Sequence, residues 1–461
     1  MPTRVLIAPR NISGQATQYA RAVAPLGIEA EVWSYGSPAF GFDADRVIDP
    51  DRLLADPGFR WSVLREAIDR FDVFHFQYAR SLLPAMKPGI PELWDLPLLS
   101  SLGKKVVMHF RGSDVRLPSV HRQLEPDSYF RQVDAPIDET RLRNRVVIAR
   151  RYCTRMLVST PGLLDYVPDA VWLPHVVDVE AWAQPVRPEP RIPLVAHIPS
   201  SRATKASDVV VPVLASLEDR GLVRGSILAD LDRTAMRAAL QDADIVVDSL
   251  TIGDHGLTSI EAMASGAIAV GHIRTRNRER NPGVPVVEAT VHTLEDVLAD
   301  LATDSGRRAE LRAEGRAWVR ARHHPDVVGP QLVDIYEGRA RPMTGVHPDW
   351  PRSSTTAQVA ALERQLEEAR AAPHGLVAGL GPGRQQLPEW AVARFAARLA
   401  ALEVALADAA PGHRLLTDPD QVDGPGHFPA TEQSLREVLR RHPRLHRLAR
   451  QARRRLQQLR R

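Results

Sequence analysis

The sequence predicts an α/β fold with two Rossmann-like domains, followed by a helical C-terminal extension. Three observations carry this prediction: a length of 461 residues, an alternation of short apolar runs with longer amphipathic segments as far as residue 340, and a proline-rich stretch that divides the alternation in two. At roughly 150 residues per domain, such a length favours more than one hydrophobic core. Alternating strand and helix patterns are typical of β-α units around a parallel sheet.

The apolar runs fall into two series, which predict an N-terminal domain over residues 1–185 and a second domain over residues 186–340. The stretch AQPVRPEPRIP between the two series has the proline content of an interdomain connector. The predicted strands of the first series are 4–8, 28–33, 73–77, 105–110 and 156–159. Those of the second are 194–197, 226–229, 245–249 and 268–271, with helices at 307–322 and 330–338 closing the domain.

Residues 341–461 differ in character from the rest and are predicted to form a linker and a helical extension. A short apolar repeat over residues 359–369 fits either a brief coiled coil or a simple amphipathic helix. Residues 435–461 predict a basic amphipathic helix, with leucines on one face among many arginines. Such a helix could lie on an anionic membrane surface, pair with an acidic protein or present a solvated face. A solvated face or a protein contact is favoured over membrane docking.

Composition narrows the class of protein further. The net charge is +4, and arginine carries nearly all the basic charge, so general arginine richness does not predict a nucleic-acid partner. The apolar run at residues 4–8 fits a buried strand better than a signal peptide, and no run of about 18 apolar residues predicts a membrane span. The single cysteine, Cys153, fits a reducing compartment. We therefore expect a cytoplasmic protein, with membrane association left open.

The first stretch that could carry chemistry is HIPSSRATK, residues 197–205. A predicted strand runs into a loop with Arg202 and Lys205, directly before a predicted helix. Two cations beside the free amides of a helix N-terminus suit a diphosphate group. The alternative is a loop with two solvated cations.

The second stretch is GDHGLTSIEAMASGAIAV, in which a glycine turn leads into a helix. Gly256 would let the backbone approach a phosphate closely, and the amides of Leu257 and Thr258 at the helix start could donate to it. Glu261, one turn further, could accept two vicinal ribose hydroxyls. An acid near a helix N-terminus that only complements the helix dipole is the alternative for Glu261.

Together, these two stretches resemble the donor domain of GT4-type glycosyltransferases, the bacterial group 1 family with the GT-B fold. The resemblance implies that Arg202 and Lys205 hold the donor diphosphate and that Glu261 binds the nucleotide ribose. It also implies two Rossmann-like domains facing a cleft. The family usually carries a second glutamate eight residues before the helix acid, where this chain has Gly253. Asp254 could substitute for that glutamate, the sugar could be held differently, or the enzyme could be impaired.

The N-terminal domain adds two weaker similarities to the same family. In VVMHFRGSDVR, the resemblance makes His109 a contact for the donor sugar and Asp114 an acceptor-side or structural group, so that His109, Asp114 and Asp254 are the candidates for catalysis. A lone histidine at a strand end is otherwise more often structural. In PRNISGQATQ, the loop resembles the glycine-bearing acceptor-side loop of these enzymes. It supplies Asn11, Ser13 and Gly14, and its alternative is an ordinary turn with Ser13 as the helix N-cap.

The resemblance implies transfer of a sugar, of hexosyltransferase type, from a nucleoside-diphosphate sugar to a hydroxyl acceptor. A UDP-sugar is the favoured donor, the acceptor is a glycan, a lipid-linked or a small molecule, and the anomeric configuration is retained. No metal and no cofactor besides the co-substrate are predicted, because Asp242 and Asp244 lack companion acids at metal-ligand spacing. The alternatives are a sugar-nucleotide epimerase and a non-catalytic nucleotide-binding or assembly protein.

Overall fold

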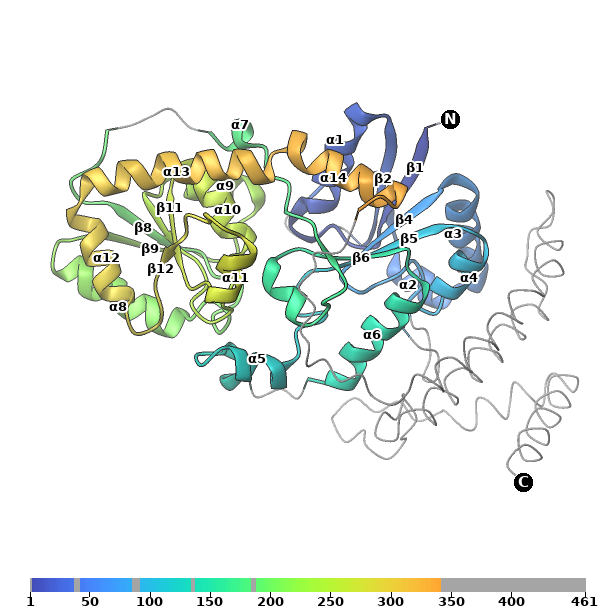
Figure 1. Ribbon diagram of the computed structural model, residues 1–461, viewed down its shortest axis with the longest axis horizontal. Coiled ribbons are helices and arrows are strands. Elements are labelled where there is room, and N and C mark those ends of the chain that lie inside the picture. The colour runs from blue at the N-terminus through green and yellow to red at the C-terminus, as the bar shows by residue number, and fades with distance from the viewer. Residues whose placement is uncertain (1, 37–41, 85–91, 134–136, 184–187, 341–461) are drawn as a thin grey trace, which may run out of the picture. The chain divides into compact units, whose positions relative to one another are not determined.

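The computed structural model describes residues 2–36, 42–84, 92–133, 137–183 and 188–340, and these form two parallel β-sheets with interleaved helices (Figure 1). The first sheet has seven strands in the order β3-β2-β1-β4-β5-β6-β7, and the second has five in the order β12-β11-β10-β8-β9. This confirms the predicted α/β class with two Rossmann-like sheets. The predicted extension over residues 341–461, including the basic helix at 435–461, lies outside the described residues, as does the predicted boundary at residue 185.

The first sheet contains every strand predicted for it, together with two short edge strands. Its strands are β1 (Thr3–Ala8), β2 (Ile28–Tyr35), β3 (Arg46–Ile48), β4 (Val73–Gln77), β5 (Lys105–Phe110), β6 (Arg155–Val158) and β7 (Val171–Trp172). The sequence did not predict β3 and β7, because two or three residues are too few to show a periodic pattern. The helices are α1 (Gln15–Val23), α2 (Pro50–Ala55), α3 (Pro57–Arg70), α4 (Leu96–Ser101), α5 (Pro118–Leu124), α6 (Glu139–Tyr152) and α7 (Val179–Trp182), with 3-10 helices at Ile12–Gly14, Ala24–Leu26, Tyr129–Arg131 and Pro161–Asp165.

The second sheet likewise contains the four predicted strands and one short edge strand. Its strands are β8 (Leu194–His197), β9 (Arg224–Ile227), β10 (Ile245–Val247), β11 (Ile268–Gly271) and β12 (Val287–Glu288). The helices are α8 (Ser207–Asp219), α9 (Arg233–Asp242), α10 (Leu257–Ser265), α11 (Thr275–Arg280), α12 (Leu294–Thr303), α13 (Ser305–His323) and α14 (Pro325–Glu337). Both predicted closing helices are present, although α14 begins five residues earlier than expected.

Helix α10 lies in the core of the second half, packed against β11, α7, α9 and α13. Its apolar side chains Ile260, Ala262 and Met263 are fully buried. The crossing with α13 is close, because a Cβ on Gly315 would lie 3.1 Å from Met263 Cγ. Small residues at this crossing therefore fix the position of α10, whose N-terminus carries the second candidate motif.

Helix α14 follows the second sheet in the chain but packs against α1 of the first half, as Figure 1 shows. The two helices approach so closely that a Cβ on Gly329 would lie 2.4 Å from the carbonyl oxygen of Ala22. At the end of α14, the hydroxyl of Tyr336 makes a 2.9 Å hydrogen bond with Nδ1 of His75 on β4. The chain thus returns to the first half, which the sequence pattern did not predict. None of the helices that the structure describes has the length and apolarity to cross a membrane.

Candidate nucleotide-sugar site

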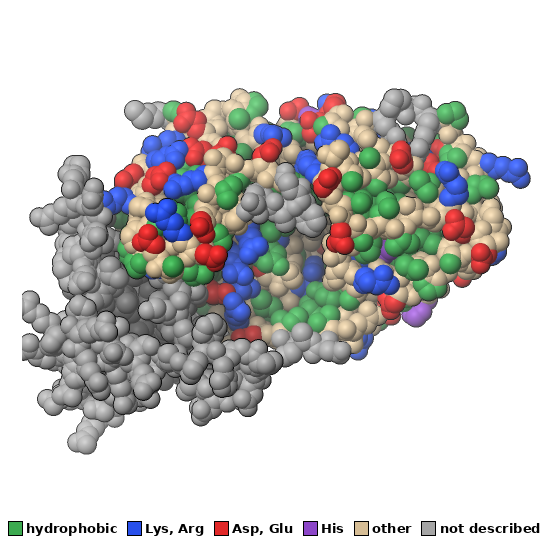
Figure 2. Space-filling view, turned by 180° about the vertical axis from the view of Figure 1, so that it is seen from behind, with side chains coloured by type: hydrophobic (Ala, Val, Ile, Leu, Met, Phe, Trp, Pro, Cys, Tyr) green, Lys and Arg blue, Asp and Glu red, His purple; other side chains and the backbone are tan. Residues whose placement is uncertain are grey.

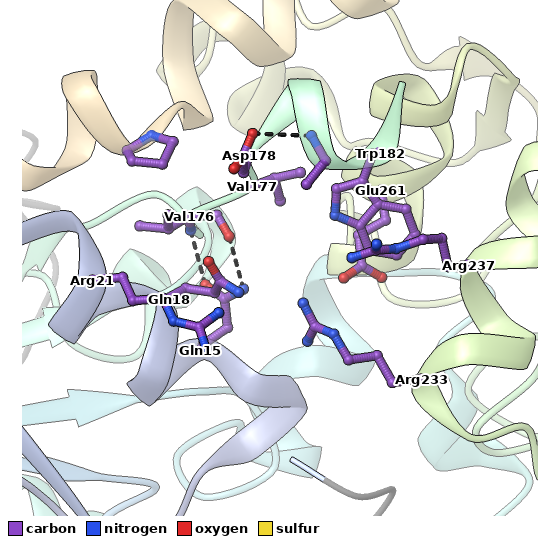
Figure 3. A pocket seen from close by; sticks show the side chains of 12 residues that line it. Gln15, Gln18, Arg21, Val176, Val177, Asp178, Trp182, Arg233, Arg237 and Glu261 are labelled. Carbon is purple, nitrogen blue, oxygen red and sulfur yellow. Dashed lines mark hydrogen bonds between the residues drawn. The ribbon is translucent and has the colours of Figure 1, made fainter. Parts of the chain in front are cut away.

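A pocket of about 290 Å³ is lined by α1, by the segment leading into α7, and by residues of α9 and α10 (Figure 3). The polar side chains that line it are Gln15, Gln18, Arg21, Asp178, Arg233, Arg237 and Glu261. A volume of this size is at the lower end of the range for small-molecule sites, which run from about 300 to 1,000 Å³. The pocket thus combines three arginines with two acids, of which Glu261 belongs to the second motif.

Gln15 of α1 holds one wall of this pocket in place. Its side-chain amide donates to the carbonyl oxygen of Val176 at 3.0 Å, and its carbonyl oxygen accepts from the Val176 amide at 2.8 Å. Both bonds are buried, so they hold the segment before α7 against the start of α1. The pair is drawn with dashed lines in Figure 3.

Glu261 lines this pocket from α10, and Arg233 and Arg237 line it from α9. Burial raises the pKa of Glu261 to about 8, although the charges of the two arginines lower it. Arg237 in turn lies over the Trp182 ring, 5.1 Å from its centroid. Within the described residues, no hydrogen bond or ion pair engages the Glu261 carboxylate. Its carboxyl group is therefore open to a ligand, and both of its oxygens can accept ribose hydroxyls once the acid is ionised, above a pH of about 8.

The N-terminus of α10 gathers the second group of predicted residues. Gly256 is the N-cap residue, and Leu257 and Thr258 open the helix. A Cβ on Gly256 would lie 3.7 Å from Nζ of Lys205, so the lysine of the first motif is next to the glycine of the second. The structure therefore brings these two motifs together, as the prediction of a shared diphosphate site requires.

Lys205 forms a buried ion pair with Asp248, which follows β10. The Asp248 carboxylate also accepts from Ser259 Oγ at 2.6 Å and from the Gly256 amide at 3.3 Å. Although burial opposes it, the Lys205 charge lowers the pKa of Asp248. An internal anion thus occupies the helix N-terminus at which a diphosphate was expected. Asp248 was not predicted as a site residue, although an acid at the end of a predicted buried strand is a signal that could have found it.

Arg202 lies in the loop between β8 and α8, with an exposed side chain. Its carbonyl oxygen accepts from the Ser207 amide at 2.9 Å, a bond that closes the turn before α8. The structure describes no hydrogen bond or ion pair of its guanidinium with the residues it covers. Unlike Lys205, Arg202 is a cation that a ligand could bind without displacing a partner.

His109 ends β5 and is fully buried in a network of polar side chains. Its Nδ1 lies 3.3 Å from Nε2 of His75, and the two rings stack with centroids 5.5 Å apart. Burial, with the nearby charge of Arg111, lowers the pKa of His109 well below its usual value, so the imidazole is neutral. Among the residues that the structure describes, Nε2 of His109 has no hydrogen-bond partner. That nitrogen is unpaired but buried, so the contact of His109 with the donor sugar stays a prediction. His75 was not predicted from the sequence.

Asp114 and Asp254, the other two candidates for catalysis, have carboxylates bound to backbone amides. Asp114 accepts from the amides of Arg111 at 3.0 Å and Gly112 at 2.7 Å, which fixes the turn after β5. Asp254 accepts from the Gly162 amide at 2.6 Å and from Nδ1 of His255 at 3.0 Å. Because both side chains are almost completely buried, these bonds give each a clear role in holding its loop.

The three acceptor-side candidates shape the start of α1. Asn11 Oδ1 accepts from the Ala16 amide at 3.0 Å, while its amide group donates to the carbonyl oxygen of Asp43 at 2.8 Å. The N-cap position belongs to Gly14, so the alternative in which Ser13 is the N-cap is wrong; Ser13 instead has a φ of 52°. A Cβ on Gly14 would lie 2.7 Å from Nη1 of Arg233, so only glycine lets the loop approach that arginine.

One cluster of the described residues has ligand atoms close enough for a metal ion: Asp178, Glu180 and His324. The Asp178 carboxylate already caps α7 by accepting from the Ala181 amide at 3.1 Å. Glu180 is 61% exposed and pairs with His324 at 3.0 Å. These contacts satisfy the cluster without an ion. Asp244 is likewise engaged, since it accepts from Arg312 at 2.8 Å and from the Leu194 amide at 2.7 Å.

No protein-family model and no curated protein matches this chain. Solved structures with a similar fold do match it. Anabaena HepE in complex with UDP matches with a TM-score of 0.51 at 13% identity, over 73% of this chain and 100% of that one. Sucrose-phosphate synthase from Thermosynechococcus elongatus matches with a TM-score of 0.50 at 15% identity, over 73% and 98%. HepE in complex with UDP-glucose matches with a TM-score of 0.50 at 13% identity, again over 73% and 100%.

The fold is therefore GT-B, the two-domain Rossmann-like architecture of these glycosyltransferases. At such low identity the likeness concerns the fold alone, and activity has to be argued from the site.

Proposed function

We propose that this protein is a glycosyltransferase that moves a sugar from a UDP-sugar to a hydroxyl acceptor. The observation that carries the proposal is the position of Glu261: its carboxylate has no partner among the described residues and faces the pocket one turn inside the helix that begins beside Lys205. A carboxylate can accept two vicinal ribose hydroxyls, and a helix N-terminus with a lysine can hold a diphosphate. The UDP and UDP-glucose complexes of HepE, which shares this fold, support the same type of ligand.

In the proposed reaction, the bond between the anomeric carbon and the β-phosphate oxygen breaks while the acceptor oxygen bonds to that carbon. Arg202 and the amides that open α10 stabilise the negative charge of the departing diphosphate, while Lys205 neutralises the Asp248 carboxylate that would otherwise repel it. These groups supply positive charge where other enzymes use a metal ion, which supports a metal-independent reaction.

We further propose that the configuration of the sugar is retained. The carboxylates of Asp114 and Asp254 are held by backbone amides, which argues against either as a covalent nucleophile. The acceptor would then attack on the leaving-group face and give its proton to the departing phosphate.

Calorimetric titration with UDP and UDP-glucose tests the donor site. At pH 9, above the pKa of Glu261, wild-type protein should bind both, and Glu261→Gln should weaken both by roughly tenfold to a hundredfold, as expected for lost hydrogen bonds to a charged group. Glu310→Gln is a matched control, because Glu310 is an exposed acid of α13 with 71% of its side chain accessible. Unchanged affinity of the Glu261 variant would contradict the assigned ribose contact.

Incubation of a UDP-sugar with candidate acceptors separates the alternatives. Release of UDP with a new glycoside of retained configuration, unaffected by a chelator, is the proposed outcome. A changed sugar on an intact nucleotide would identify an epimerase, and binding without turnover over a broad acceptor panel would favour a non-catalytic protein.

A further inference from the structure

Three neighbouring strands of the first sheet are each followed closely by an arginine. Arg10 comes two residues after β1, Arg80 three residues after β4, and Arg111 directly after β5. The strands are parallel and adjacent in the sheet order β1-β4-β5, so these arginines belong to the same edge of the sheet. Ligands of open α/β sheets bind outside this carboxyl edge.

Most of the charged groups that act on Arg80 are positive. Arg80 interacts electrostatically with Arg145, Arg10 and Arg141, and with one acid, Glu92. That acid is already engaged, because it pairs with Arg141 and lies 2.5 Å from Nε of Arg145. Together with burial, the surrounding cations lower the pKa of Arg80, while Glu92 raises it. Arg10 and Arg80 are exposed, so an anion from solution can reach them, and like charges near one another repel unless an anion joins them.

Arg10, Arg80 and Arg111 have no ion pair within the part of the chain that the structure describes. Arg111 donates to the hydroxyl of Tyr19 at 3.3 Å, which is a neutral partner. The nearby carboxylate of Asp114 accepts from backbone amides and so is directed at the turn rather than at these guanidinium groups. None of these three cations is therefore neutralised by an ion pair of its own among the described residues.

The backbone before Arg80 gives an independent sign of a functional site. Tyr78 and Ala79 have φ values of 64° and 45°, so two consecutive non-glycine residues adopt the left-handed region. The Tyr78 amide donates to the carbonyl oxygen of His109 at 2.9 Å, and the Tyr78 hydroxyl contacts Ser113. Such strain persists where the surroundings impose it and clusters at ligand sites. Here the Tyr78 bond ties the strained turn to His109, the candidate sugar contact at the end of β5, and Arg80 follows this turn directly in the chain.

We propose that Arg10, Arg80 and Arg111 form a subsite for a phosphate group on the acceptor. The inference rests on the proposed glycosyl transfer and specifies the chemical class of its acceptor. A phosphate with close to two negative charges and three accepting oxygens matches three cations better than a single carboxylate, and guanidinium groups bind phosphate in a two-point geometry. The hydroxyl that receives the sugar would belong to the same phosphorylated molecule.

Calorimetric titration with glycerol 3-phosphate, in the presence of saturating UDP, tests this subsite. Wild-type protein should bind the probe and should not bind glycerol at the same concentration. Arg80→Gln and Arg10→Gln should each weaken binding of the probe by about tenfold or more, as for a lost charge-assisted hydrogen bond, and leave the UDP affinity unchanged. Arg52→Gln is the matched control, since Arg52 is a 60% exposed arginine of α2 in the same half of the protein.

A second experiment, with lipid vesicles, distinguishes a phosphate on a lipid acceptor from a phosphate on a small soluble acceptor. Phosphatidylcholine vesicles with phosphatidic acid, compared with phosphatidylcholine alone, report a lipid phosphate; binding that depends on Arg80 in this experiment alone would assign the subsite to a lipid acceptor. If neither probe binds, or if Arg80→Gln binds as tightly as wild type, the proposal is overturned. Probe binding that falls with Arg202→Gln but not with Arg80→Gln would place the probe in the donor site and would also overturn it. The titration with UDP alone is separate: if UDP does not bind there, the proposed function is contradicted and not the phosphate subsite.

Discussion

The carboxylate of Glu125 lies directly against Gly253, so that a Cβ on residue 253 would be 2.6 Å from Oε2. Glu125 follows α5 in the first half of the chain, and its carboxylate is buried beside His272, whose Nε2 is 3.1 Å from the same oxygen. Gly253 is the position at which the resembled family carries a glutamate. In this protein the space on that side of the backbone is taken by an acid from a segment 128 residues earlier in the chain.

Gly253→Ala should destabilise the protein by about 2–4 kcal/mol. The added Cβ would meet Oε2 of Glu125, and the φ of 72° is costly for any residue with a Cβ. Chemical denaturation measures the loss. Gly221→Ala is the matched control, because Gly221 has a φ of 70° but nothing within 4 Å of its added Cβ, and it should cost only about 1–2 kcal/mol. Equal losses in the two variants would show that contact with Glu125 has no effect.

The pair between Glu125 and His272 should make stability depend on pH. The protonated ring of His272 donates hydrogen bonds to the carboxylates of Glu125 and Glu288, which raises the pKa of His272 to about 9 from its usual 6.5. A raised histidine pKa means that its stabilisation is complete below pH 6.5 and is lost as the pH rises through about 9.

His272→Gln should therefore cost about 1–3 kcal/mol at pH 6 and much less above pH 9.5. Denaturation curves at both pH values test this, with His292→Gln as control, since the side chain of His292 is 77% exposed. A loss that is the same at both pH values would rule out the charged imidazole as its source.

Glu261→Gln should stabilise the protein at neutral and alkaline pH while it weakens nucleotide binding. Burial raises the pKa of Glu261 to about 8 from 4.5, so the folded state favours the protonated acid. The wild type is then most stable, with respect to this group, below pH 4.5 and loses stability as the pH rises toward 8.

The glutamine variant lacks that loss and should exceed the wild type by about 1–3 kcal/mol at pH 8.5. At pH 4 the two should be equal. Thermal unfolding at the two pH values tests this, and a variant that is less stable than the wild type at pH 8.5 would contradict it.

Lys205→Ala should cost about 3–5 kcal/mol, because it leaves the buried carboxylate of Asp248 without its cation. The double variant Lys205→Ala/Asp248→Ala should lose less than the single variant, since no unpaired charge remains. Arg220→Ala removes a surface pair with Glu295, in which the side chains are 52% and 44% exposed, and should change stability by about 0–1 kcal/mol. If the double variant is the less stable one, the pair is not the reason for the loss.

Much of the fold could be predicted because its signals are local. The strands at residues 73–77, 105–110 and 194–197 have the predicted bounds, since a buried parallel strand reads as a short apolar run between turn residues. Gly256, Leu257 and Thr258 also lie at a helix start as predicted, because glycine turns and caps are encoded over a few residues. The long return of α14 was missed, because no periodicity tells which sheet a helix packs against.

The sequence by itself determined the two parallel sheets and the two motifs that meet at the N-terminus of α10. The tertiary structure alone decided what those residues contact: Lys205 is paired with Asp248, His109 is stacked on His75, and Glu125 fills the side of Gly253. The physical reason is that hydrophobic periodicity and turn chemistry act over neighbouring residues, whereas these contacts join side chains 34 to 128 positions apart. Such contacts exist only once burial has fixed the surrounding helices and strands.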